Sequence, residues 1–155
     1  MKHPREFTFT EIVVIVAVVA ALAALSVPAY KLLVTRARVA AAISVLNTLS
    51  SNETSFYQRT GQLPTDIGQI NAGNVGSAAP ASRYVRSVRL ERGGKLVAVL
   101  NPTEVAMVSA GSNEVAVVPQ PTQSAIRWRC GPNINRNPVA YLLLPMSCQD
   151  TITAQ

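Results

Sequence analysis

The chain has 155 residues, of which 48% are hydrophobic and 14% are charged, and its formal net charge is +6. That length accommodates one domain with room for an appendage. The composition is too apolar for a disordered chain and low in charge for an ordinary soluble domain.

Much of the apolar excess lies in residues 12–29, a run of about 18 residues without a charged side chain. As a helix this run is about 27 Å long, at about 1.5 Å per residue, which just spans the hydrocarbon core of a bilayer. Two other interpretations stay open. One is a cleaved secretory signal peptide, for which Ala23-Ala24-Leu25-Ser26 loosely resembles a cleavage site, and the other is a buried core helix. The length fits a retained membrane span best.

A single carboxylate, Glu11, directly precedes this apolar run. An ionisable group within a membrane span costs a few kcal/mol or more, so by default it is functional and has a partner. The alternative is that Glu11 lies at the membrane edge and reaches water, because only a few residues separate it from the polar start of the chain.

Helical periodicity continues beyond the apolar run to about Arg59. A three-and-four spacing of apolar residues predicts one stripe, formed by Val39, Ala42, Leu46, Leu49 and Phe56. The pattern therefore predicts one long helix, apolar all round in its first half and amphipathic in its second. Pro28 should bend this helix, because proline removes a backbone hydrogen bond and clashes with the preceding turn. Thr60-Gly61, followed by Pro64, should end it.

After a loop of small residues at 61–82, the apolar period changes from helical spacing to alternation. The candidate strands are residues 83–90, 95–100, 105–108, 114–118 and 124–130. Turn residues between the first and second of these strands, and between the third and fourth, predict two hairpins. The expected fold class is α+β, with the long helix packed on an antiparallel sheet of four or five strands.

The two cysteines, Cys130 and Cys148, fit neither a CxxC redox motif nor the spacing of zinc ligands. An even pair that brackets a loop rich in Pro and Asn predicts a disulfide, and hence an oxidising compartment for this part of the chain. Two unpaired buried thiols are the alternative. The basic residues that flank the apolar run weakly favour the opposite membrane orientation, and we give the cysteines more weight.

The chain starts with a short basic segment, residues 1–6, which precedes an ordered set of features without gaps. These features are Phe7-Thr8, a glutamate as the fifth residue counted from Phe7, an unbroken apolar helix, Pro28-Ala29-Tyr30 and residues 34–39. This set resembles the N-terminal region of type IV pilins, with major-pilin spacing from Phe7 to Glu11, Pro28 and Arg36. The plan of helix, loop, antiparallel sheet and terminal cysteine loop is also similar to the pilin head, in layout more than in residues.

The resemblance implies a role for each part of the chain. A prepilin peptidase would cleave between Glu6 and Phe7 and methylate the new amine of Phe7. That amine would pair with Glu11 of a neighbouring subunit, so Glu11 would set the assembly register, because an unpaired buried charge penalises every other register. The implied segments are a leader (1–6), a membrane and filament-core helix (7–34), its amphipathic half (35–60), a loop (61–82), the sheet (83–130), a disulfide-bounded loop (130–148) and a tail (149–155).

Three positions depart from the family pattern. Glu6 stands where the family has Gly, and if Phe7 stays joined to Glu6 there is no free amine for Glu11 to meet. Phe9-Thr10 replaces the usual apolar pair. Ala20 replaces a glycine that often lets the helix unwind in filaments, and alanine makes this less easy.

By this resemblance the protein is a structural subunit that polymerises through its N-terminal helix into a type IV pilus for adhesion, twitching motility or DNA uptake. Its partners would be further copies of the chain, the prepilin peptidase and the pilus assembly platform. It would lie in the inner membrane before assembly and in an extracellular pilus on the bacterial surface afterwards. A minor pilin and a secretion-system pseudopilin are the alternatives, and the latter typically lacks the terminal cysteine bridge.

No enzyme, cofactor or metal site is expected from the sequence. The only histidine, His3, lies in the expected leader, and the carboxylates are scattered without a pair spaced for acid–base chemistry. A calcium site that combines loop carbonyls with Asp66 or Asp150 is the one open alternative.

Five basic residues cluster within thirteen positions: Arg83, Arg86, Arg89, Arg92 and Lys95. Such a patch attracts nucleic acid without sequence preference, so a membrane-anchored nucleic-acid-binding module is a further alternative. The competing interpretation is a solvated strand edge whose charges prevent aggregation. Tyr84 is the only aromatic residue nearby that offers a base a ring to stack on.

Overall fold

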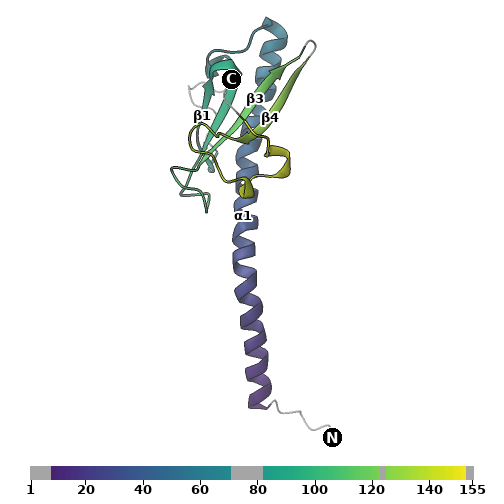
Figure 1. The fold of residues 1–155 in the computed structure, drawn as a ribbon, viewed down its shortest axis with the longest axis vertical. Helices are drawn as coiled ribbons and strands as arrows, with labels where there is room; N and C mark the ends of the chain where they lie inside the picture. Colours follow the sequence, from purple (N-terminus) through teal and green to yellow (C-terminus); the bar gives the residue numbers. More distant parts are fainter. Residues whose placement is uncertain (1–7, 71–81, 123–124, 153–155) are drawn as a thin grey trace. The chain divides into compact units, whose positions relative to one another are not determined.

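The computed structural model describes residues 8–70, 82–122 and 125–152. The chain divides into two compact units between Val34 and Thr35. Helix α1 (Phe9–Thr60) contributes to both units, and the strands belong to the second, which we call the head (Figure 1).

Helix α1 runs without interruption through Pro28. It ends where Gly61 takes a φ of +70°, a left-handed conformation that glycine adopts without a steric penalty. The N–H of Gly61 donates to the carbonyl of Tyr57 at 2.8 Å and closes the last turn. The prediction of one long helix is confirmed, while the bend at Pro28 stays a prediction.

The head contains one antiparallel sheet with its strands in sequence order. They are β1 (Val85–Glu91), β2 (Lys95–Leu100), β3 (Glu114–Pro121) and β4 (Ile126–Pro132). A tight turn, η2 (Arg92–Gly94), joins β1 to β2, as the sequence predicts for the first hairpin. The expected α+β class, with a helix on an antiparallel sheet, is confirmed.

The strand expected at residues 105–108 does not form, so the second predicted hairpin is wrong. β3 pairs directly with β2, and β1 occupies the other side of β2, so no edge of β2 is left for the segment between β2 and β3. That segment turns instead: the carbonyl of Asn101 accepts from the N–H groups of Glu104 and Val105. The apolar side chain of Val105 is fully buried, which explains the strand-like pattern of the sequence.

One face of the sheet packs on the second half of α1. Leu96, Val117 and Cys130 lie side by side on this face, because paired residues of an antiparallel sheet point to the same side. From the same face Trp128 donates its Nε1–H to Oγ1 of Thr54 on the helix at 3.0 Å. The buried apolar side chains of the helix include Val39, Ala42, Ile43, Leu46 and Leu49.

The opposite face of the sheet is also covered, which the sequence did not predict. Val97 and Ala116 form a second small core there with Ile152, a residue of the C-terminal segment. The N–H of Asp150 donates to the carbonyl of Cys130 at 2.9 Å, and Ile152 pairs with the residue that follows β4. The C-terminal segment therefore lies against β4 and closes an otherwise open edge of the sheet.

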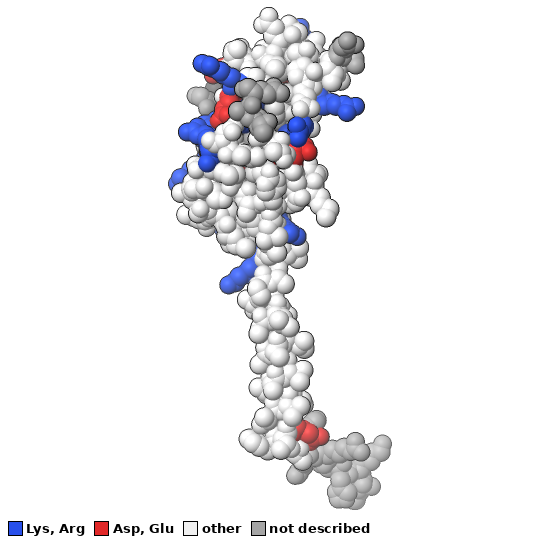
Figure 2. Space-filling view, in the orientation of Figure 1, with Lys and Arg blue, Asp and Glu red and all other residues white. Residues whose placement is uncertain are grey.

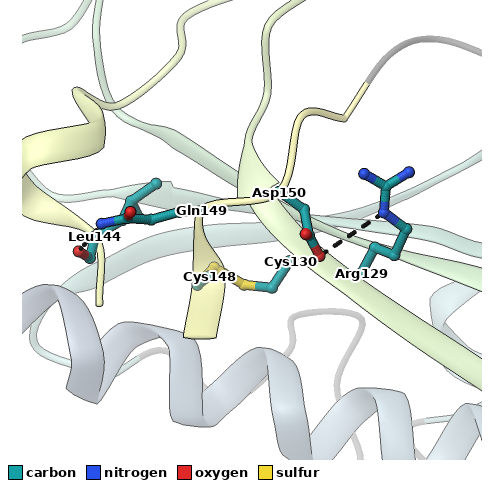
Figure 3. Close-up of a disulfide and its surroundings, with 6 residues drawn as sticks. All are labelled: Arg129, Cys130, Leu144, Cys148, Gln149 and Asp150. Carbon is teal, nitrogen blue, oxygen red and sulfur yellow. Dashed lines mark hydrogen bonds and ion pairs between the residues drawn. A yellow bond between two sulfur atoms is a disulfide. The ribbon is translucent and has the colours of Figure 1, made fainter. Parts of the chain in front are cut away.

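A disulfide joins Cys130, in β4, to Cys148, with a distance of 4.4 Å between the two Cα atoms (Figure 3). The predicted bridge is confirmed. The loop that it bounds is also tied to α1, because Arg36 donates from Nε to the carbonyl of Leu142 at 2.7 Å.

Gly131 offers a test of the contact between β4 and the C-terminal segment. A Cβ at this position would collide with the backbone oxygen of Asp150, which cannot rotate away. We expect Gly131→Ala to lower the free energy of unfolding of the head by about 1–3 kcal/mol, the usual cost of overpacking. Thermal unfolding of the full chain in detergent measures this effect. Gly111→Ala is the matched control, because a Cβ there meets nothing within 4 Å, and it should change the stability by less than about 0.5 kcal/mol.

Candidate functional site

The first half of α1 exposes a continuous apolar surface. Its large side chains are half or more exposed in most cases, among them Phe9, Val14, Leu22, Leu25 and Leu33. Among the described residues α1 is the one helix long and apolar enough, by length and composition, to cross a membrane. In Figure 2 this stretch lacks blue or red side chains over most of its length. A soluble monomer rarely exposes so large an apolar surface, so this surface is a site for lipid or for other protein.

Glu11 lies in the first turn of α1, and its contacts are local. Its Oε2 accepts from the N–H of Thr8 at 2.9 Å and from Oγ1 of Thr8 at 2.8 Å. In return Oγ1 of Thr8 accepts from the N–H of Glu11 at 3.4 Å. This reciprocal arrangement is a capping box, which satisfies backbone donors at the start of a helix. Glu11 thus has a structural role within one chain, and its role as an assembly register stays a prediction.

The leader cleavage site and the methylation site fall on residues that the structure does not describe. Glu6 and Phe7, where leader cleavage and methylation are expected, lie outside the described residues. Pro28 lies inside α1, where proline leaves one backbone carbonyl without its helical donor.

The five clustered basic residues are largely paired with acids. Nε of Arg83 lies 2.7 Å from Oε2 of Glu104. A guanidinium nitrogen of Arg89 lies 2.9 Å from Oε1 of Glu114, and Nζ of Lys95 lies 3.1 Å from Oε2 of Glu91. The two other members, Arg86 and Arg92, are exposed. The structure thus neutralises much of the predicted basic patch.

Glu114 is the centre of a polar cluster on the outer face of the sheet, which is the face that points away from α1. Its side chain is almost fully buried, and it accepts from Arg89 and, at 2.6 Å, from Nδ2 of Asn133. Burial alone would raise its pKa, but the hydrogen bonds from these two side chains and the positive charges of Arg89 and Arg136 together outweigh burial, and the pKa of Glu114 is lowered. Asn133 also accepts from Lys95 at 2.8 Å. Sequence reasoning missed this cluster, because its members are far apart in the chain and follow no motif.

Residues 35–149 match the model of the Pilin family, which is described as pilin (bacterial filament). Because this match covers more than half of the chain, the protein belongs to the pilin family. That family consists of structural filament subunits and not of enzymes, which confirms the prediction that the chain is not an enzyme.

Similar proteins extend over nearly the whole chain. It is 29% identical over 148 residues to the type IV major pilin protein PilE of Neisseria gonorrhoeae, which covers 96% of this chain and 81% of PilE. It is 26% identical over 150 residues to the fimbrial protein EcpC of Eikenella corrodens. This match covers 95% of this chain and 92% of EcpC. The type IV pilin of Pseudomonas aeruginosa strain Pa110594 has a similar fold, with a TM-score of 0.55 and 14% identity, over 74% of this chain and 97% of that one.

Proposed function

We propose that the protein is the structural subunit of a type IV pilus, assembled from many copies that bury the first half of α1 against one another. The observation that carries this proposal is the exposed apolar surface between Glu11 and Lys31. Burial of such a surface yields about 25 cal/mol per Å², so many neighbouring helices together hold a filament strongly. The matching relatives are named major pilins and fimbrial proteins, which supports the same role.

The same surface suits the membrane before assembly. On this proposal the subunit waits in the inner membrane, where a prepilin peptidase removes residues 1–6 and methylates Phe7. The assembly platform then adds it to an extracellular pilus used for adhesion, twitching motility or DNA uptake. The alternatives within the class are a minor pilin and a pseudopilin. The Cys130–Cys148 bridge favours a pilin over a pseudopilin, and the relatives named as major pilins favour a major over a minor pilin.

The structure does not favour nucleic-acid binding as a second function. Arg83, Arg89 and Lys95 are engaged with acidic side chains, and Tyr84, the one aromatic residue within positions 83–95, is partly buried. Arg86 and Arg92 alone leave few phosphate contacts, and affinity for nucleic acid grows with their number.

Intact-mass and N-terminal analysis of the protein from its own cells tests the proposal. We expect a chain that begins at methylated Phe7, because only a free amine gives Glu11 a partner in a filament. A chain that still begins at Met1 would make α1 an ordinary anchor and remove the proposed function. Glu6→Gly is the matched variant: if the bulky acid slows cleavage, the mature fraction rises in this variant, and if it does not, the two fractions are equal.

A further inference from the structure

Glu53 is a carboxylate enclosed in the core of the head. Its side chain has no exposed surface, and within the described part of the chain neither Oε1 nor Oε2 has a hydrogen-bond partner. The polar residues beside it are already engaged: Oγ1 of Thr54 donates to the carbonyl of Ser50 at 2.8 Å and accepts from Trp128. An ionised carboxylate in such a place lacks both water and donors, and this is strongly unfavourable.

The turn between β1 and β2 covers this carboxylate. A Cβ added at Gly94 would collide with Oε1 of Glu53, and the ring of Pro119 in β3 lies against the same position. Gly93 and Gly94 both have a φ of 76°, which glycine adopts freely, so the backbone of the turn can approach the helix closely. The turn is thus seated on the carboxylate itself.

Charged groups on the surrounding elements do not compensate Glu53. Arg92 on the turn, Arg127 on β4 and Arg59 on α1 are exposed. At the start of β2, Lys95 bonds to Glu91 and Asn133, and on β3 Glu114 bonds to Arg89. On β4, Nε of Arg129 lies 3.7 Å from Oδ2 of Asp150. Burial is therefore the one cause that acts on this carboxyl, and it raises the pKa of Glu53 to about 8.

We propose that protonation of Glu53 holds the β1–β2 turn on α1, and that ionisation of Glu53 releases the turn so that water reaches the carboxylate. The head is then a pH-responsive element in which one proton controls one hairpin. This inference does not depend on filament assembly, because every residue that carries it lies within the head.

The sign of the pH dependence follows from the two states of the turn. Released, Glu53 is hydrated and has its ordinary pKa of 4.5; seated, it has a pKa of about 8. Between these values the released state has lost the proton and the seated state keeps it, so the equilibrium constant for release rises by up to about tenfold per pH unit. Above pH 8 both states are ionised and the dependence levels off.

Trp128 reports on this change, because it is the only tryptophan in the sequence and bonds to the neighbour of Glu53. We expect its emission, in the full chain in detergent micelles, to shift to longer wavelength as the pH rises from 5 to 9, with a midpoint no higher than about 8. In Glu53→Gln, which keeps the shape and cannot ionise, the emission should not respond. Glu104→Gln removes a surface partner of Arg83 instead and should respond like the original chain.

Hydrogen exchange at the amides of Gly93 and Gly94 measures release directly. After correction for the intrinsic rate, their protection should fall by up to about tenfold per pH unit between pH 5 and 8 and stay constant in Glu53→Gln. A chain whose Trp128 emission and turn protection are constant over this range would overturn the proposal. So would a Glu53→Gln variant that keeps the pH response of the original chain.

Discussion

Glu11→Ala should lower the yield of assembled filaments by about a hundredfold or more while the head stays folded. In the proposed filament Glu11 is enclosed by apolar helices and pairs with the amine of the next subunit. Removal of one partner from such a pair costs about 3–5 kcal/mol, and each 1.4 kcal/mol changes an equilibrium about tenfold. Filaments sheared from cells, quantified against total subunit, measure the effect. Thermal unfolding of the head serves as the control for folding.

The capping box at Thr8 makes a sharper version of this experiment available. Glu11→Gln keeps a side chain that can complete the box but removes the charge, whereas Thr8→Ala removes the cap and keeps the charge. If the charge sets the register, Glu11→Gln assembles as poorly as Glu11→Ala, and Thr8→Ala assembles well. The reverse order would show that Glu11 serves only to start α1, and the register proposal would then be wrong.

Replacing both Cys130 and Cys148 by Ser should produce the largest loss of stability in the head. The bridge closes a loop over a sequence separation of 18, for which the chain-entropy model gives about 3 kcal/mol. It also anchors the segment that covers the outer face, because Asp150 follows Cys148 closely and bonds to Cys130. Unfolding of the full chain in detergent, followed by Trp128 emission, measures the loss.

Asp150→Ala is the matched control for the bridge. It removes the ion pair with Arg129 (Figure 3), in which both side chains are close to half exposed, and an exposed pair contributes less than about 1 kcal/mol. If the double serine variant were no less stable than Asp150→Ala, the bridge would not hold the C-terminal segment in place.

The parts of the fold that local pattern governs were predictable from the sequence. The helical spacing continues from the apolar run into the stripe at Val39 and Leu46, and Pro28 is the one residue within α1 that strongly disfavours a helix. The first hairpin has strong turn residues at Gly93-Gly94, and Cys130 and Cys148 had only each other as partners.

The features that were missed depend on contacts between distant segments. Residues 105–108 form a short apolar run of the kind that a buried strand has, yet β1 and β3 already flank β2, so the run is a loop anchored by its buried side chains. The partners of Arg89 and Lys95 lie in other strands, and no spacing in the sequence indicates them. Glu53 lies between Leu49 and Phe56 at the three-and-four spacing of the apolar stripe, and its burial was missed because a charged residue was not expected on the packed face. In the candidate site, the exposed apolar helix was predictable, whereas the bond from Thr8 to Glu11 was not recognised.

Ile152 is synthesised long after helix α1. This residue belongs to the core on the outer face of the sheet, yet it follows the end of α1 by roughly ninety residues. At about 5–20 residues per second, a ribosome delivers it roughly 5–20 s after the helix. The apolar first half of α1 is thus available to the membrane before Ile152, which packs on Val97 and Ala116, has been made. The core of Val97, Ala116 and Ile152 can therefore close only after α1 has been synthesised and is available to the membrane.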